Sequence, residues 1–315
     1  LLASSAASDV YKRQKLSIPM MISMLVQALY NVVDSVFVSH VSESALTAVS
    51  LAFSLQNVMI AVGVGTGVGV NALLSKSLGE KNQSRANATA ENGIFLSLCS
   101  FAVFFVIGLT CMKPYFYAQT SDSVIAQQGI RYLSVCCIFS LGLFTQTMGE
   151  KLLAATGRTY LSMISQLVGA VVNIILDPIF IFGFRWGMMG AAVATVIGQL
   201  VTAALAVWYL LHMKIIRPEK GDYRLKGSIC GRTLTLGMTS FLSQISLVAA
   251  MAAINNMIRK YGALDAVFGQ EQYAQIPMAV VGIVMKFFQI VISIVVGMAA
   301  GCIPTVSYTH LTLPT

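Results

Sequence analysis

Two carboxylates interrupt apolar runs of the sequence, and they are the residues best placed to do chemistry. Asp177 lies in NIILDPIFIFGF, residues 173 to 184, and Asp34 lies in a run that begins near residue 16. A charge at the centre of a membrane helix costs about 2.5–3.5 kcal/mol even on the most permissive insertion scale, so intramembrane acids are functional candidates. Carboxylate oxygens bind protons and metal cations. Asp34 and Asp177 are therefore candidate functional residues that could bind a cation.

Polar side chains recur at helical spacing around both acids. Residues three, four or seven apart share one face of a helix, and four apolar runs carry a polar face of this kind. Together these faces predict a shared polar interior. The alternative is hydrogen bonding between helices, which for any single face is the stronger explanation. The four faces consist of Gln27, Tyr30, Asn31 and Asp34; Ser50, Ser54 and Asn57; Gln166, Asn173 and Asp177; and Thr195, Gln199 and Thr202.

Proline residues mark two positions where these helices could bend. Pro178 has no N–H, so the carbonyl of Ile174 loses its helical partner next to Asp177. A freed carbonyl there offers an oxygen ligand or a bending point. Pro19 would act in the same way in the first run, although membrane helices also tolerate proline for packing reasons. We interpret Pro19 and Pro178 as hinges.

The composition identifies the class of protein that must position these residues. Hydrophobic residues make up 57% and charged residues 10% of the 315, and the mean hydropathy is +0.78. Soluble domains carry about a quarter charged residues, so the chain is predicted to be an all-α, multi-pass membrane protein. The net charge of +8 comes from basic residues in short loops, which favours contact with membrane lipid and not with nucleic acid. The six cysteines show no metal-ligand spacing.

About eight stretches are long enough to cross the hydrocarbon core as helices. If the first begins inside, the inner loops hold 12 Lys and Arg against 5 outside, which places the amino end in the cytoplasm. Only Asp34 and Asp177 of the twelve acids fall within these spans, each 18 residues from the inner end of its span. Equal depth lets the two acids face each other. The predicted spans are 16–39, 45–70, 92–112, 124–147, 160–183, 188–211, 236–257 and 274–300.

Two sequence echoes suggest a repeated organisation. LTLGMTSFLSQ resembles LSIPMMISMLVQ, and GMAAGCIPTVS resembles GTGVGVNALLS, although any two apolar helices look somewhat alike. The glycines of GVGTGVGV are interpreted as helix-packing positions, because no strand precedes them as in a phosphate-binding loop. The expected organisation is a six-helix lobe at 15–211, a cytoplasmic loop at 212–235, and the first two helices of a second lobe at 236–306. Residues 1–14 and 307–315 resemble non-native tails. We therefore expect the sequence to be a fragment.

Two stretches of the sequence resemble the multidrug and toxic compound extrusion (MATE) transporters. AATGRTYLSMISQLVGAVVNIILDPIFIFGFRWGMMGAAVATVIGQ is similar to their fifth and sixth helices, and LSIPMMISMLVQALYNVVDSVFVSHVSESALTAVSLA is similar to their first. The resemblance covers nearly all of residues 15–306. It implies two six-helix lobes in the cytoplasmic membrane, and export of cationic amphipathic compounds in exchange for H⁺ or Na⁺.

The resemblance also assigns roles to individual residues. The family's amino-lobe cation site matches Asp34, Asn173 and Asp177, which makes these three the candidate Na⁺ ligands. Its first-helix tyrosine and proline match Tyr30 and Pro19. Family residues on the fourth and sixth helices match Tyr132 and Thr195. One branch uses a seventh-helix glutamate, and 236–257 contains no acid, so the resemblance gives no second cation site here.

The expected mechanism is exchange of a cation for a drug at Asp34 and Asp177. Two carboxyl groups that share a buried site tend to hold one proton between them. Neutralising the pair from outside would bend the first span at Pro19 and release a cationic drug outward. No cofactor is expected beyond the coupling ion, and the partners are cationic small molecules and membrane lipid. We expect a monomer.

Two rival functions make different demands on the sequence. A lipid-linked oligosaccharide flippase of the same superfamily would line its cavity with several basic residues, and only Lys286 and Arg131 are candidates. Lys286 could line a cavity or extend to the membrane surface, and the sequence leaves both open. A membrane-embedded enzyme would need a catalytic histidine, a nucleophile with acids, or a metal set within the spans, and the sequence shows none.

Overall fold

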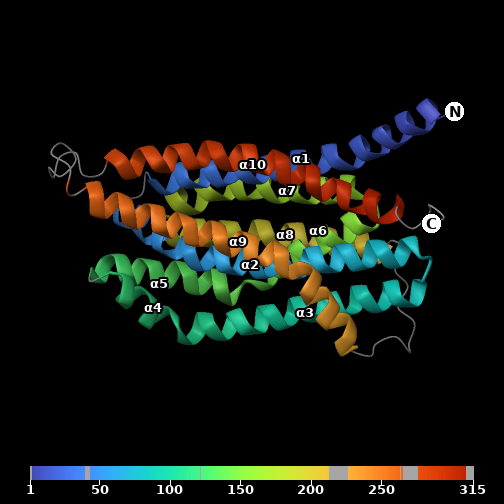
Figure 1. Ribbon diagram of the computed structural model, residues 1–315. Coiled ribbons are helices and arrows are strands. Elements are labelled where there is room, and N and C mark those ends of the chain that lie inside the picture. The colour runs from blue at the N-terminus through green and yellow to red at the C-terminus, as the bar shows by residue number, and fades with distance from the viewer. Residues whose placement is uncertain are drawn as a thin grey trace.

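The computed structural model describes residues 2–39, 43–120, 122–212, 226–262, 264 and 276–309, and these are almost entirely helical (Figure 1). No strand occurs among them, which confirms the predicted all-α class. The elements are α1 (Leu2–Ser39), α2 (Glu43–Gly79), α3 (Gln83–Thr110), α4 (Met112–Gln119), α5 (Ser123–Ile138), α6 (Leu141–Ala155), α7 (Thr159–Pro178), the π-helix η1 (Ile179–Gly183), α8 (Met188–His212), α9 (Gly227–Gly262) and α10 (Ile276–Thr309).

Each of the eight predicted spans coincides with helical structure over its described residues, and residues 274 and 275 of the last span lie outside them. Within the described residues, six helices are long and apolar enough to cross a membrane on their own. The predicted span 124–147 is two helices, α5 and α6, which meet at an angle of 47° and together could make a seventh. α10 contains a shorter apolar stretch, Phe287–Ala299. The multi-pass architecture is therefore confirmed, and the number of spans stays approximate.

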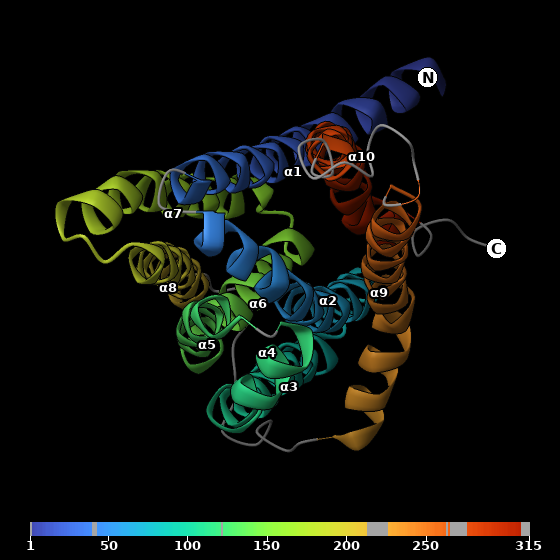
Figure 2. The same ribbon diagram turned by 90° about the vertical axis from the view of Figure 1, so that its left-hand side faces the viewer.

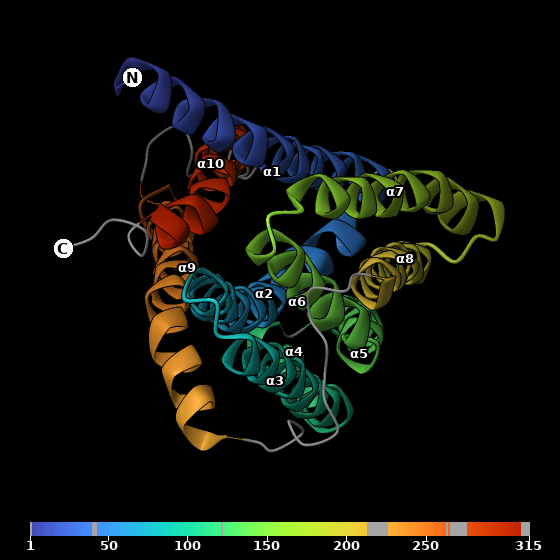
Figure 3. The same ribbon diagram turned by 90° about the vertical axis from the view of Figure 1, so that its right-hand side faces the viewer.

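The helices run nearly parallel to one long axis, with alternating direction (Figure 1). Views along that axis show α2 and α6 near the centre, α3, α4 and α5 on one side, and α7 and α8 on another (Figures 2 and 3). α1 lies against α7 and α10, and α9 lies against α2. We call the end that carries the α2–α3 and α6–α7 connections the inner end, following the predicted orientation.

Glycines bring α2 and α9 into direct backbone contact. A Cβ atom at Gly69 would overlap the carbonyl oxygen of Thr233, and a Cβ at Gly237 would overlap that of Gly65. A helix pair can approach this closely only where side chains are absent. The interpretation of GVGTGVGV as a packing motif is confirmed for these positions.

The α1–α10 pair repeats this arrangement with the order of the helices exchanged. A Cβ atom at Gly297 on α10 would lie 2.6 Å from the Cα of Met21 on α1. Gly297 and Gly65 occupy corresponding places in the two echoed stretches. The second helix of each expected lobe thus contacts the first helix of the other, as a two-fold repeat requires.

Replacing Gly69 by alanine should weaken the α2–α9 contact. The new methyl group meets backbone atoms that cannot rotate away, and overpacking of this kind costs about 1–3 kcal/mol. Gly63→Ala on the same helix is the matched control, because its Cβ would meet only ordinary contacts of 3.6 Å or more. Thermal unfolding in detergent should show a lower midpoint for Gly69→Ala alone. Equal midpoints for both variants would contradict the contact.

Three predicted boundaries differ from the helix ends. The expected loop 212–235 is shorter, since α9 already begins at Gly227, and the Lys226 N–H donates to Asn92 Oδ1 at 3.2 Å. The stretch 1–14 continues α1 from Leu2 onward, and α10 extends to Thr309. Apolar windows locate the membrane core of a helix, whereas the helix itself continues until a cap or a turn ends it.

Candidate functional site

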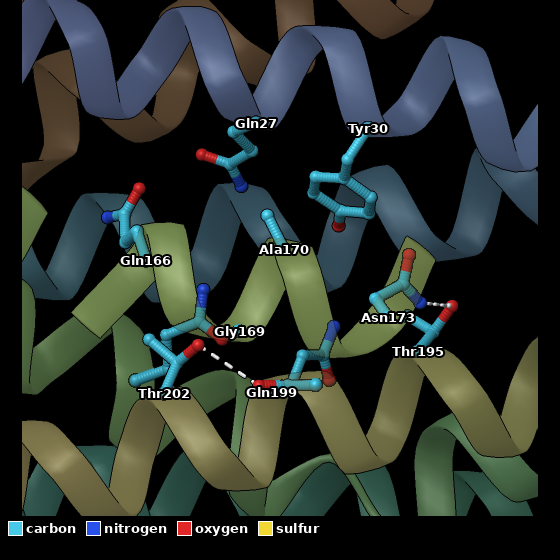
Figure 4. Close-up of a pocket in the computed structure, with 11 residues that line it drawn as sticks. Gln27, Tyr30, Gln166, Gly169, Ala170, Asn173, Thr195, Gln199 and Thr202 are labelled. Carbon is cyan, nitrogen blue, oxygen red and sulfur yellow. Dashed lines mark hydrogen bonds between the residues drawn. The ribbon is translucent and has the colours of Figure 1, made fainter. Parts of the chain in front are cut away.

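A narrow cleft lies between α1, α7 and α8, and α6 contributes one side chain to it (Figure 4). Its volume is about 30 Å³. That is room for one or two water molecules or an ion, but not for a drug-sized ligand. The lining residues are Gln27, Tyr30, Gln146, Gln166, Gly169, Ala170, Asn173, Thr195, Gly198, Gln199 and Thr202.

Three of the four predicted polar faces meet in this cleft. They are those of α1, α7 and α8, whose side chains converge in Figure 4. The face on α2 does not take part: Ser54 is exposed, Asn57 is partly buried, and neither lines the cleft. The side chain of Ser50 lies outside the described residues. The prediction of four converging faces is therefore wrong for α2, which instead faces α9 through its glycines.

Glycines hold α7 and α8 close enough for their polar groups to touch. A Cβ atom at Gly198 would lie 2.9 Å from the Gly169 carbonyl oxygen and 3.1 Å from the Cβ of Asn173. A Cβ at Gly169 would overlap the hydroxyl of Thr202. Because Gly169 and Gly198 have no side chains, Asn173 lies directly against α8 at Gly198, which is one helical turn from Thr195.

Asn173 links Asp177 to α8. In one orientation of its amide, the nitrogen donates to Thr195 Oγ1 at 3.4 Å, as drawn in Figure 4. Rotated by half a turn, the amide donates to Asp177 Oδ2 at 3.3 Å and accepts from the Thr195 backbone N–H at 3.2 Å. The rotated orientation satisfies both neighbours, so we assign it. Asn173 thus orients one oxygen of Asp177.

The two predicted acids do not line the cleft: each lies one helical turn outward of a lining residue, Asp34 after Tyr30 and Asp177 after Asn173. Asp177 is fully buried and Asp34 is partly buried, and their carboxyl groups interact electrostatically. Tyr30 is close enough to interact with both. One oxygen of each acid, Oδ1, is buried and accepts no hydrogen bond from the part of the chain that the structure describes.

Such orphaned carboxylate oxygens need explanation in a folded protein, because buried polar atoms nearly always have partners. Carboxylate oxygens are hard donors of the type that alkali and alkaline-earth cations prefer. A proton on one carboxyl group would serve equally well, since it would turn an acceptor into a donor. The arrangement therefore fits either coupling ion.

The chain continues past Pro178 as a π-helix, which the sequence pattern did not predict. η1 leads into a turn with positive φ at Arg185 (55°) and Gly187 (54°). The rings of Phe180, Phe184 and Trp186 stack on one another at centroid distances of 5.5–5.8 Å. Single-turn π-helices are common at functional sites. Pro19, in contrast, lies in α1 without ending it; its hinge role and that of Pro178 stay predictions.

Two further predicted residues lie outside the cleft lining. Tyr132 is buried on α5, where its hydroxyl accepts a hydrogen bond from Gln56 Nε2 at 3.2 Å and interacts electrostatically with Asp34. Asn31 is exposed, although it shares the α1 face by spacing. The side chain of Lys286 lies outside the described residues. Gln56 was not anticipated, since nothing in its sequence neighbourhood distinguishes it.

A further buried acid lies outside the predicted spans. Glu150 and Lys151 are buried near the end of α6, with 7% and 4% of their surface exposed, and their charges pair at 2.7 Å. The prediction placed Lys151 in an inner loop because two charged residues in succession usually mark the end of a membrane span. An ion pair neutralises both charges, which allows the helix to continue to Ala155. The resumed apolar run Leu152–Ala155 was the available signal.

The sequence profile of the MatE family matches residues 19–179, which are 161 of the 315 residues. The chain belongs to the MatE family. This confirms the resemblance to the MATE transporters, and the matched region contains Asp34, Asn173 and Asp177.

The similarity of this MatE chain to relatives and to solved structures extends over nearly its whole length. The chain is 24% identical over 323 residues to the multidrug export protein MepA of Staphylococcus aureus (strain bovine RF122 / ET3-1), covering 96% of this chain and 65% of the relative. MepA of Staphylococcus saprophyticus is also 24% identical, over 307 residues. The chain thus spans 65% of the length of these relatives. They are transporters and not enzymes, and the apolar helices agree with a multi-pass membrane protein.

The MatE fold is likewise shared with transporters of known structure. An outward-facing multidrug resistance MATE transporter of the MOP superfamily matches with a TM-score of 0.84 at 27% identity, covering 95% of this chain and 64% of that one. A MOP superfamily transporter from Pyrococcus furiosus, described as having a binding pocket of reversed polarity, matches with a TM-score of 0.81 at the same identity and coverage.

Proposed function

We propose that this MatE chain belongs to a cation-coupled exporter that moves cationic amphipathic compounds out of the cell in exchange for H⁺ or Na⁺. The observation that carries the proposal is the pair of orphaned oxygens on Asp34 and Asp177, just outward of the cleft. The names of the relatives as multidrug export proteins support the direction and the class of substrate.

The coupling follows from one negative site that serves two cations in turn. A proton or Na⁺ on Asp34 and Asp177 removes the charge that attracts a cationic drug. A drug that approaches the charged pair, conversely, disfavours the small ion. Because linkage is reciprocal, each ligand must weaken the binding of the other by the same factor. With the amino end in the cytoplasm, this pair lies near the outer surface, from which the driving ion enters.

The flippase alternative receives no support from the cleft. An anionic lipid-linked substrate would require basic side chains, and none of the described lining residues is charged. The Pyrococcus furiosus transporter, with its reversed pocket polarity, indicates that members of one fold can differ in this respect. The preference for a cationic substrate therefore rests on Asp34 and Asp177 and not on the uncharged cleft.

The test is competition between a drug and the small ion on the purified chain. In lipid nanodiscs, ethidium binding is followed by fluorescence anisotropy while choline is replaced by Na⁺, and separately while the pH is lowered. We expect saturating Na⁺ or acid to weaken ethidium binding about tenfold, in the range typical of coupled sites. If neither ion changes the ethidium affinity, the chain does not couple the two ligands and the proposal fails.

A further inference from the structure

A second charged cluster lies at the inner end of the cleft. Glu150 accepts hydrogen bonds through both carboxylate oxygens, from Lys151 Nζ at 2.7 Å and from Gln166 Nε2 at 2.6 Å. The Gln166 side-chain oxygen in turn accepts from the hydroxyl of Ser23. The cluster joins α6, α7 and α1, and all four residues are buried.

Gln166 connects this cluster to the site already described. It lines the cleft and also donates to Glu150, whereas Asn173 lines the same cleft and contacts Asp177. Gln166 and Asp177 are eleven residues apart on one face of α7, or about 16 Å at the rise of an α-helix. Glu150 therefore lies beyond one end of the polar cleft and Asp177 beyond the other, and the polar side chains that line the cleft between them are uncharged (Figure 4).

The contact between Glu150 and Lys151 has an unusual geometry for a permanent ion pair. Neighbouring residues on a helix point in different directions, so the two charges meet only because the long lysine stem bends back. Gly67 on α2 provides the space for that stem, since a Cβ atom there would lie 2.8 Å from Lys151 Cγ. Lys151 thus carries its charge on a long stem that folds back toward Glu150.

We propose that Glu150 is a second cation-binding carboxylate of the cleft, and that Lys151 is a tethered counter-ion which an arriving Na⁺ or proton replaces. The proposal rests on the proposed cation coupling, and it gives the ion released by Asp34 and Asp177 a next binding site on the way inward. When the ion binds Glu150, the Lys151 ammonium swings toward the inner surface, one turn beyond the pair. When the ion leaves, Lys151 returns and restores neutrality.

The groups that contact Glu150 and Lys151 from α7, α1, α2 and α8 carry no charge. Gln166 on α7 and Ser23 on α1 are neutral, and α2 and α8 present Gly67 and Ala206 beside α6. Lys151 supplies the one ion pair that Glu150 makes within the described residues. The exchange therefore involves one carboxylate, one tethered ammonium and one mobile monovalent cation.

The experiment removes the outer site and asks whether ion binding persists. In an Asp34→Asn/Asp177→Asn background, the thermal midpoint of the chain in nanodiscs is measured while Na⁺ replaces choline at about pH 8, and separately while the pH falls without Na⁺. A ligand that binds only the folded state raises the midpoint. We expect a residual rise of several degrees, and the arm that shows it identifies the ion as Na⁺ or H⁺.

Adding Glu150→Gln/Lys151→Gln should abolish that residual rise. This double change leaves no unpaired buried charge, so the chain should still fold. Lys76→Gln/Glu80→Gln is the control, because it removes one positive and one negative charge at the same end of the bundle, where Glu80 pairs with Lys76 at 3.8 Å and with Arg85 at 3.2 Å. Lys151→Gln alone should increase the apparent ion affinity about tenfold by removing the tethered competitor.

Two outcomes would overturn the proposal. One is the absence of any ion-dependent shift in the Asp34→Asn/Asp177→Asn background. The other is a residual shift that survives Glu150→Gln/Lys151→Gln. The proposed function fails in a different way, namely if the unsubstituted chain and the Asp34→Asn/Asp177→Asn chain respond identically to the ions.

Discussion

Asp177→Asn is expected to abolish drug export while leaving the fold intact. The amide has nearly the shape of the carboxyl group, yet it cannot take up a proton and carries no charge to hold Na⁺ or a cationic drug. In cells expressing the protein, ethidium efflux should fall about 100-fold, toward the level of cells without the transporter. Asp177 is the stronger test because it is fully buried and contacts Asn173.

The control for this substitution is Asp122→Asn. Asp122 is exposed and accepts hydrogen bonds from the backbone N–H groups of Val124 and Ile125 at the start of α5. Asparagine caps helices about as well as aspartate, so efflux and stability should not change. Asp34→Asn should reproduce the loss seen for Asp177→Asn. Efflux at the unsubstituted level from both variants would disprove the role of the pair.

Gly198→Leu should disable the same site from the opposite wall. The new side chain cannot occupy the space already filled by Asn173 and the Gly169 carbonyl, so α8 must move away from α7. Overpacking typically costs about 1–3 kcal/mol, and here it also withdraws Thr195 from Asn173. We expect a lower unfolding midpoint and an affinity for the coupling ion at least about tenfold weaker, measured by the ion-dependent midpoint shift.

Gly231→Ala separates this effect from a general sensitivity of glycines. A Cβ atom at Gly231 meets nothing within 4 Å, and the residue lies inside α9. Alanine is the better helix former by about 1 kcal/mol, so this variant should be slightly more stable. If Gly198→Leu bound the ion as well as the unsubstituted chain does, close packing of α7 and α8 would not be what forms the site.

The sequence alone predicted the helices, and it placed Asp177 and Asn173 on one helix face, because both depend on local signals. Apolar length defines a span, and helical spacing identified the faces that carry Asp177 and Asn173. Long-range pairing is not local. Gln56 reaches Tyr132 across 76 residues of sequence, and no periodicity indicates such a contact. Asn31 shows the converse, since it has the right spacing but is exposed, at the edge of the face that α1 turns inward.

Glu150 was missed for a different physical reason. Hydropathy scales treat each charge as an isolated cost, whereas two opposite charges that pair inside the bundle cost far less together than separately. The sum over a window therefore ended the predicted span at 147, before the pair. The π-helix after Pro178 was missed because its wider turn depends on how Phe180 packs beside Gly190, which only the folded structure contains.

The glycine contacts of α2 with α9 and of α1 with α10 constrain how the expected lobes can move. Backbone atoms that already touch cannot be pressed closer, and they leave no side chain to deform, so relative motion there is limited to tilting. Two such pivots, placed on corresponding helices, define a single axis across the bundle. Tilting about that axis widens the gap between the two lobes on one face of the membrane and narrows the gap between them on the other face. We therefore expect a continuous open passage to be sterically forbidden at every stage of the transport cycle.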